Sequence, residues 1–189
     1  MKKESILIAA VALVVGLLGG YLVFTISTAG KQQVTPSIPT GSGSPTDYSR
    51  RITEAEKIVA ADPTNINAWL SLGNDYFDTD QPQKSINAYS KVLELNPNNA
   101  NVLTDQGVMY RKLGWYDKAL ANFEKAQQID PRHLQSLYNL GVVYAIDLKQ
   151  PDKAEEVWRK YLKLDPNSPT AMQVKEMMQS SGSGGWQRK

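Results

Sequence analysis

The feature that most constrains the fold is a fixed interval of 34 residues between similar side chains. Gly73, Gly107 and Gly141 follow one another at this interval. Their neighbours keep the same spacing, with Trp69, Leu103 and Leu137 before the glycines and Tyr76, Tyr110 and Tyr144 after them. A constant period of about 20–50 residues is typical of stacked repeats of one small structural unit. The chain is therefore predicted to fold as a repeat array.

Each repeat is predicted to begin with an amphipathic helix. Trp69, Leu72, Gly73 and Tyr76 lie at positions i, i+3, i+4 and i+7, on one face of a helix. Glycine inside a helix costs about 1 kcal/mol relative to alanine, so its recurrence at one register indicates a packing requirement. We expect a second helix to cross there, too close for a side chain.

The second half of each repeat supplies that second helix. Small residues recur at one position and aromatic residues four positions later: Ser85, Ala119 and Ala154, then Tyr89, Phe123 and Trp158. Each unit ends on a proline, which stops a helix: Pro97, Pro131 and Pro166. The third unit is one residue longer, and we expect the extra residue in the turn at 147–153.

These residues resemble the tetratricopeptide repeat (TPR) family, with its pattern Trp-x2-Leu-Gly-x2-Tyr followed by Ala, Phe and Pro. Residues 66–99 match this pattern almost completely. Residues 100–133 match it with Leu103 for Trp and Gln106 for Leu, and 134–168 with Leu137 for Trp and Trp158 for Phe. The resemblance implies an all-α TPR superhelix of helical hairpins, with three repeats spanning 66–168.

Flanking helices are expected at both ends of this array. Residues 47–65 contain the stop signal Asp62-Pro63 and resemble the second helix of a repeat that lacks its first. Residues 169–180 follow Ser168, a favourable helix cap, and are predicted to cover the last hydrophobic face. The tail, 181–189, is expected to be disordered. The alternative is a short binding motif formed by Trp186, Arg188 and Lys189.

Residues 1–29 are predicted to be one N-terminal transmembrane helix, a signal anchor. No charged residue lies between Glu4 and Lys31, and the apolar run 6–26 would span roughly 31 Å as a helix, about the thickness of a bilayer core. The alternative is a cleaved signal peptide, because residues 27–29 are small enough for a cleavage site. The apolar region of a signal peptide is usually only about 7–15 residues long, however, which favours the anchor.

Lys2 and Lys3 precede the apolar run, so the N-terminus is expected to stay cytoplasmic and the repeats to be periplasmic or extracytoplasmic. Ala12, Gly16 and Gly20 are spaced four apart, a pattern that lets two membrane helices approach and would permit a homodimer. The alternative is that glycine is simply common in membrane helices. Residues 30–46 are rich in Pro, Gly and Ser and are predicted to be a flexible linker.

Few residues are suited to chemistry. The chain has no cysteine and one histidine, so thiolate and multi-histidine metal sites and a Cys-His nucleophile are excluded. His133, in the turn after Pro131, is expected at the surface. The net charge is +2, with basic residues at both ends and a nearly neutral body, which does not favour nucleic acid binding. We expect no enzymatic activity, cofactor or metal.

The resemblance to TPR proteins implies a protein or peptide partner, held in a concave groove lined by the first helix of each repeat. The alternative is that many of these positions are ordinary solvated ones. The candidate groove residues lie off the packing face: Asn67, Leu70, Asn74, Phe77, Asp78, Asn101, Thr104, Asp105, Val108, Arg111, Gln135, Tyr138, Asn139 and Val142.

One branch of the family clamps a C-terminal carboxylate with Lys, Asn and Arg. Asn74 matches this pattern, but Leu70, Asp105, Gln135 and Asn139 stand in place of the other clamp residues. The leading hypothesis is therefore a membrane-anchored interaction module, or scaffold, of another specificity. A narrower alternative is a peptide-holding subunit of cytochrome c maturation, because a single anchor followed by a few TPR units is similar to such factors.

Overall fold

The computed structural model describes residues 44–181. The predicted anchor at 1–29, with Ala12, Gly16 and Gly20, lies outside the described residues, as do most of the predicted linker and the tail from 182 onward. Every regular element between residues 44 and 181 is helical, and this range contains no strand. None of the helices in this range is long and apolar enough to cross a membrane.

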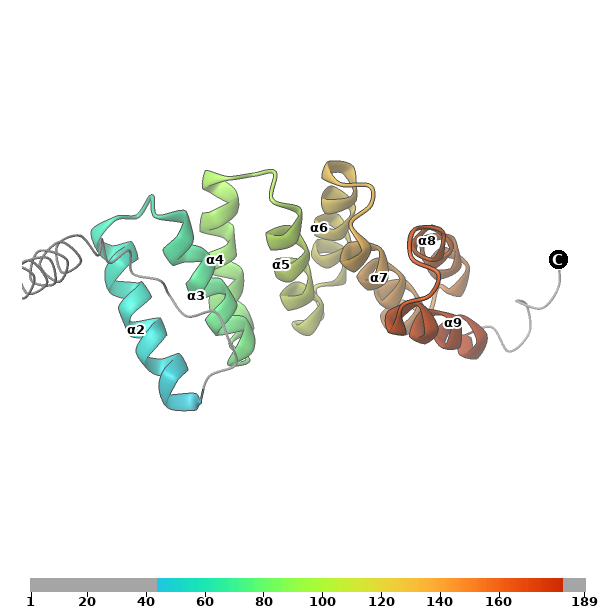
Figure 1. Ribbon diagram of the computed structural model, residues 1–189, viewed down its shortest axis with the longest axis horizontal. Helices are drawn as coiled ribbons and strands as arrows, with labels where there is room; N and C mark the ends of the chain where they lie inside the picture. The colour runs from blue at the N-terminus through green and yellow to red at the C-terminus, as the bar shows by residue number, and fades with distance from the viewer. Residues whose placement is uncertain (1–43, 182–189) are drawn as a thin grey trace, which may run out of the picture. The chain divides into compact units, whose positions relative to one another are not determined.

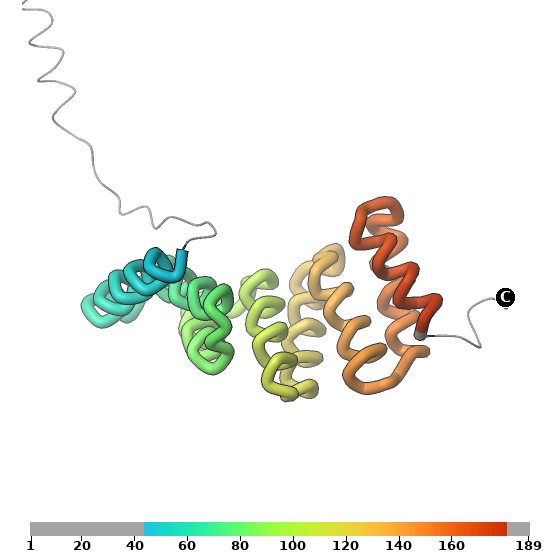
Figure 2. Tube along the Cα trace, turned by 90° about the horizontal axis from the view of Figure 1, so that it is seen from below, coloured from blue at the N-terminus to red at the C-terminus, as the bar shows by residue number. Residues whose placement is uncertain are grey.

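The described helices follow one another in a row, as Figures 1 and 2 show from two directions. Their bounds are α2 Pro45–Ala61, α3 Ile66–Asp78, α4 Pro82–Leu95, α5 Ala100–Lys112, α6 Tyr116–Ile129, α7 Leu134–Val142, the π-helical turn η1 Val143–Asp147, α8 Pro151–Leu164 and α9 Pro169–Ser181. Each helix packs on its neighbours in sequence, and α5 also meets α7. The hairpins are α3–α4, α5–α6 and α7–α8, as the repeat pattern predicts.

The three repeated glycines lie where an aromatic ring of the second helix presses on the first. A Cβ atom on Gly107 would lie 2.5 Å from Cε1 of Phe123, closer than atoms can pack. Gly73 meets Tyr89 and Gly141 meets Trp158 even more closely. The expected close crossing is present, and the aromatic side chain itself occupies the space that the glycine leaves. The small residue one turn earlier, such as Ser85, is completely buried beside it.

The residue before each first helix caps it. Asn65 Oδ1 accepts a hydrogen bond from Ala68 N–H at 3.0 Å, and Asn99 Oδ1 accepts one from Val102 N–H at 3.1 Å. His133 holds the same position in the third repeat, and its Nδ1 accepts from the N–H of Ser136 at 3.3 Å. His133 is half-buried because its ring caps α7, a role that the expectation of a surface residue does not include.

The helix α2 is tied to the first repeat by a buried ion pair. Arg51 of α2, 8% exposed, binds Asp75 of α3, which is 0% exposed. Tyr76 Oη donates to Glu56 Oε1 at 2.6 Å across the same pair of helices. Ala55 and Val59 complete the contact from the α2 side. The helix α2 therefore packs as the second helix of an incomplete repeat, as its sequence predicts.

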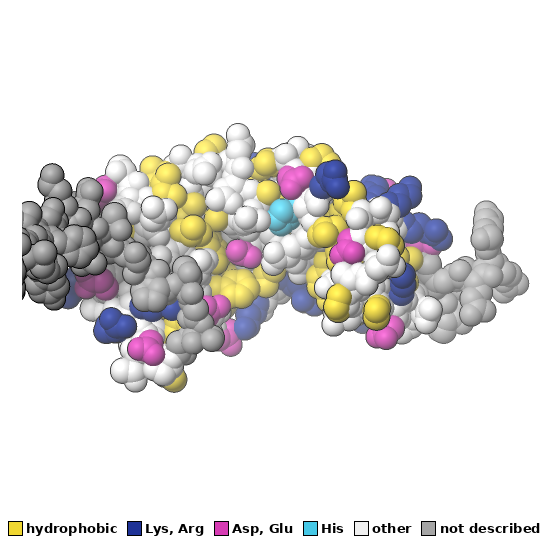
Figure 3. All heavy atoms as spheres, viewed as in Figure 1, with side chains coloured by type: hydrophobic (Ala, Val, Ile, Leu, Met, Phe, Trp, Pro, Cys, Tyr) yellow, Lys and Arg dark blue, Asp and Glu magenta, His cyan; other side chains and the backbone are white. Residues whose placement is uncertain are grey.

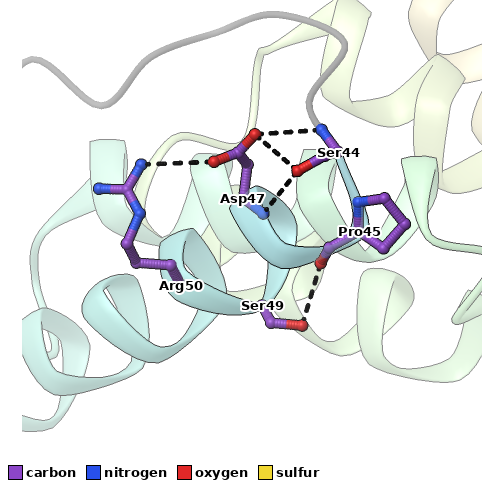
Figure 4. Close-up of polar contacts among 5 residues, drawn as sticks. All are labelled: Ser44, Pro45, Asp47, Ser49 and Arg50. Atoms are coloured by element: carbon purple, nitrogen blue, oxygen red, sulfur yellow. Dashed lines mark hydrogen bonds and ion pairs between the residues drawn. The ribbon is translucent and has the colours of Figure 1, made fainter.

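The start of α2 is fixed by a capping box, shown in Figure 4. Asp47 N–H donates to Ser44 Oγ at 3.4 Å, and Ser44 N–H donates to Asp47 Oδ2 at 3.2 Å. The hydrogen bond from the Ser44 hydroxyl lowers the pKa of Asp47. Pro45 occupies the first helical turn, where its missing N–H costs nothing. Residues 44–46, placed in the linker on composition, therefore belong to the start of this helix.

The extra residue of the third repeat lies earlier than the sequence suggests. The α3–α4 and α5–α6 turns close with hydrogen bonds from Gln81 N–H to Tyr76 O and from Trp115 N–H to Tyr110 O. In the third repeat the matching bond runs from Gln150 N–H to Tyr144 O at 2.7 Å and encloses one more residue. The π-helical turn Val143–Asp147 holds that residue by widening the end of the first helix.

The glycine contact predicts a specific loss of stability. Gly107→Leu should lower the free energy of unfolding of residues 44–181 by about 1–3 kcal/mol, because the Phe123 ring is completely buried and cannot move aside without opening the hairpin. Chemical denaturation followed by circular dichroism measures the loss. Ala121→Leu, an exposed position on α6, is the control and should change stability by no more than about 0.5 kcal/mol. Equal effects of the two substitutions would contradict the packing account.

Candidate functional site

The candidate groove residues come from α3, α5 and α7, and we call the surface that their exposed members form the groove side. Asn67, Asp78, Asn101 and Gln135 are exposed. Half-buried members of the set are Leu70, Asn74, Phe77, Asp105, Val108, Arg111 and Tyr138. These residues form a surface of mixed polar and apolar character, with chemical groups suited to hold an extended chain.

Three of the candidates pack inside the domain. Thr104 is completely buried, and its hydroxyl donates to Ala100 O at 2.9 Å. Asn139 is buried and its side-chain amide donates to Gln135 O at 2.8 Å. Val142 is part of the hydrophobic core shared by α7, α8 and α9. Their side chains therefore stabilise the array and add nothing to the exposed part of the groove side.

Several other candidates already have partners in the fold. Arg111 binds Asp147 of η1, with 3.3 Å between Nη2 and Oδ1. Asn101 Oδ1 accepts a hydrogen bond from His133 Nε2 at 2.8 Å. Tyr138 packs against the core of the third repeat, where its backbone carbonyl accepts from Trp158 Nε1 at 3.2 Å. Contact of these residues with a partner stays a prediction.

The first two repeats line an open pocket of about 300 Å³, which we call the acidic pocket. Asn74, Phe77 and Asp78 from α3, Tyr89 from α4 and Asp105 from α5 line it. Four of these five residues belong to the candidate groove set. Tyr89 Oη donates to Asn74 Oδ1 at 2.9 Å, which holds the amide in place beside the carboxylates. The pocket thus brings Asp105 of the second repeat together with three candidate residues of the first repeat.

The acidic pocket is an unfavourable place for a negative charge. Burial, with a further contribution from the charge of Asp78, raises the pKa of Asp105 to about 6. Asp78 receives a hydrogen bond from Tyr48 Oη of α2 at 3.2 Å. In the part of the chain that the structure describes, no side chain donates a hydrogen bond to the Asp105 carboxylate. Of the two carboxylates, only Asp78 therefore accepts a side-chain hydrogen bond from the described part of the chain.

Two residues near the acidic pocket were not in the candidate set. The Tyr89 hydroxyl reaches the pocket through its bond to Asn74. A tyrosine where the family pattern has phenylalanine is the sequence signal for this role, because a buried tyrosine hydroxyl needs a partner. Tyr48 lies on the flanking helix and contacts Asp78. Its role depends on how α2 packs, which no local motif in the sequence indicates.

The C-terminal end of the array, unlike the acidic pocket, is rich in basic side chains. Figure 3 shows hydrophobic and acidic side chains over the middle of the face that it presents, and Lys and Arg side chains gathered toward the C-terminal end. A second cavity, of about 490 Å³, lies between α8 and α9 and is lined by Arg159, Leu162, Lys163, Lys175, Met178 and Gln179. Among residues 44–181, no three His, Asp or Glu side chains are grouped so as to hold a metal ion.

Models of the tetratricopeptide repeat match the chain at 66–99, 88–121, 107–145 and 134–168. Together they cover every residue from 66 to 168, with the glycine and aromatic positions of all three hairpins. The chain belongs to the tetratricopeptide repeat family. TPR domains mediate protein–protein interaction and are generally not enzymes. The models at 66–99 and 134–168 have the same bounds as the first and third repeats predicted from the sequence.

Solved TPR structures share this fold. The crystal structure of MamA is 23% identical, covers 74% of this chain and 79% of its own, and superposes with a TM-score of 0.69. The TPR2B domain of yeast Sti1 in complex with an Hsp70 peptide is 18% identical over 71% of this chain and 98% of its own, with a TM-score of 0.56. The first TPR of Spaghetti (RPAP3), bound to the HSP90 peptide SRMEEVD, is 20% identical over 61% and 94%, with a TM-score of 0.56. A search of curated protein sequences found no match.

The raised pKa of Asp105 predicts an unusual dependence of stability on pH. Between about pH 4 and 6 the native state holds a proton that the unfolded state has lost, so ionisation of Asp105 lowers stability as the pH rises through this range. At pH 7.5, Asp105→Asn should therefore raise the free energy of unfolding by up to about 3 kcal/mol, and the gain should vanish near pH 4. Urea denaturation at several pH values measures it.

The matched control is Asp117→Asn, which removes an exposed carboxylate from α6. It should give no gain between pH 4 and 7.5 comparable to that of Asp105→Asn. If Asp105→Asn were less stable than the unmodified chain at pH 7.5, the folded state would favour the ionised carboxylate, which would contradict this account.

Proposed function

We propose that this chain is a membrane-anchored interaction module whose TPR domain binds an extended segment of a protein partner along the groove side. The observation that carries the proposal is the acidic pocket, a cavity of about 300 Å³ between α3 and α5. Its lining combines the aromatic ring of Phe77 with polar groups, as ligand pockets commonly do. Exposed Asn67 and Gln135 extend this surface along the first helices of the first and third repeats.

Two solved neighbours support binding of a peptide by this fold, because their structures contain Hsp70 and HSP90 peptides. This chain has different chemistry at the candidate positions. The family branch that clamps a carboxylate has lysine and asparagine at the positions where Leu70 and Asp105 stand here. We therefore propose a partner other than an acidic C-terminal peptide.

The anchor and its orientation are part of the proposal. They rest on the uncharged run between Glu4 and Lys31 and on the two lysines that precede it. The anchor would hold the TPR domain at the outer face of a bacterial-type inner membrane, with Ala12, Gly16 and Gly20 available for pairing two anchors. A role in cytochrome c maturation stays a narrower prediction, which capture of cytochrome apoproteins would support.

The orientation can be tested with a reporter. Alkaline phosphatase fused after Lys189 should be active, and a fluorescent protein that folds only in the cytoplasm should be dark at the same position. The control fusion begins at Lys31 and lacks the apolar run, so its phosphatase should be inactive. Cytoplasmic reporter activity of the full chain would contradict the orientation, and a mature chain beginning near Gly30 would contradict the anchor.

The binding surface can be tested by capture of the partner from crosslinked membranes. Asn67→Ala combined with Gln135→Ala alters two exposed positions on the groove side, so it should leave stability within about 1 kcal/mol and reduce captured partner at least several-fold. Lys125→Ala combined with Gln128→Ala, both exposed on α6, is the matched control and should capture as much as the unmodified chain. Equal capture by the two double variants would place the interaction on another surface.

A further inference from the structure

The acidic pocket holds two carboxylates and no group of opposite charge. Asp78 and Asp105 face the cavity from α3 and α5, and the other lining residues, Asn74, Phe77 and Tyr89, are neutral. The Asp78 charge acts on Asp105, which shows that the two groups lie within electrostatic reach of each other. Like charges that share a partly buried pocket repel, so the pairing of these two carboxylates is electrostatically unfavourable.

Three basic side chains on the neighbouring helices form ion pairs with carboxylates that do not line the pocket: Arg51 with Asp75, Lys112 with Asp80 and Arg111 with Asp147. Moving any of them into the pocket would break an existing pair. A cationic ligand would neutralise the acidic pocket without breaking any of these pairs.

The walls of the cavity restrict the shape of that ligand. The half-buried Phe77 supplies aromatic surface, against which a chain of methylene groups can pack, and Tyr89 contributes its hydroxyl. Lysine and arginine carry such a chain and end in a cation, which an aromatic ring also attracts. A metal ion fits poorly, because the described residues do not bring three acidic or imidazole ligands together here. An acidic ligand would add a third negative charge.

Resting on the proposed function, we propose that the acidic pocket is a subsite for one lysine or arginine side chain of the bound partner segment. The cation lies between Asp78 and Asp105, and its stem packs on Phe77. The partner's backbone then passes along the first helices of the repeats, where exposed groups such as Asn67 can bind it. The subsite selects basic segments, the opposite preference from that of a carboxylate clamp.

The test selects peptides from a displayed random nonapeptide library on the purified full chain in detergent. Parallel selections use Asp105→Asn, which removes the charge with little change in shape, and Asp117→Asn, which removes an exposed charge from α6. Peptides selected by the unmodified chain and by Asp117→Asn should share a lysine or arginine at one position. The preference at that position should be lost with Asp105→Asn, while preferences elsewhere in the peptide remain.

One selected peptide is then synthesised with a fluorescent label, together with a version that has norleucine in place of its basic residue. Fluorescence anisotropy should show about ten- to a hundredfold weaker binding of the norleucine peptide to the unmodified chain. Asp105→Asn should bind the two peptides within about twofold of each other, because the interaction with the cation is already lost. Its circular dichroism and thermal unfolding establish that this variant is folded.

The outcomes separate this subsite from the general proposal. Selected peptides without a shared basic position, or an unchanged lysine preference in Asp105→Asn, would overturn the subsite and leave peptide binding by the groove side intact. Failure of all three proteins to select any peptide would overturn both proposals.

Discussion

The contact between a helical glycine and an aromatic ring sets the geometry of all three described hairpins. The rings of Tyr89, Phe123 and Trp158 occupy the volume where a Cβ atom of the facing glycine would lie. This contact brings the two helices of a repeat together at one register, and stacking of the hairpins follows from it. It also positions the candidate site, because Asn74 follows Gly73 directly and receives the hydrogen bond of the Tyr89 hydroxyl. One packing contact thus fixes both the first repeat and one wall of the acidic pocket.

Much of the fold was predictable because it depends on local spacing. The period through Gly73, Gly107 and Gly141 predicts the hairpins, and Ser168 caps the last helix as its sequence indicates, accepting from Ala171 N–H at 3.1 Å. The place of the extra residue was not predictable from spacing. An extra residue in the turn and an extra residue at the end of the first helix give the same spacing in the sequence. The hydrogen bond from Leu148 N–H to Val143 O distinguishes them, because it forms the π-helical turn.

The candidate site was less accessible to sequence reasoning, because its character depends on contacts between repeats. Thr104 and Asp105 are adjacent polar residues on α5, yet the first is completely buried and the second lines a cavity. Their difference arises from how α5 meets its neighbours, which helical periodicity cannot resolve. The acidic pocket also carries an electrostatic cost, seen in the raised pKa of Asp105. Titratable groups with strongly shifted pKa values are more common at functional sites than at purely structural positions.

The central claim is that a partner segment lies on the groove side across the acidic pocket, and site-specific photo-crosslinking in intact cells tests it most directly. A photoreactive phenylalanine analogue replaces Phe77, which lines the pocket, or Gln128, which is exposed on α6, in the full chain. The account predicts a covalent adduct with a partner from position 77 and none from position 128. Adducts from position 128 alone would contradict it.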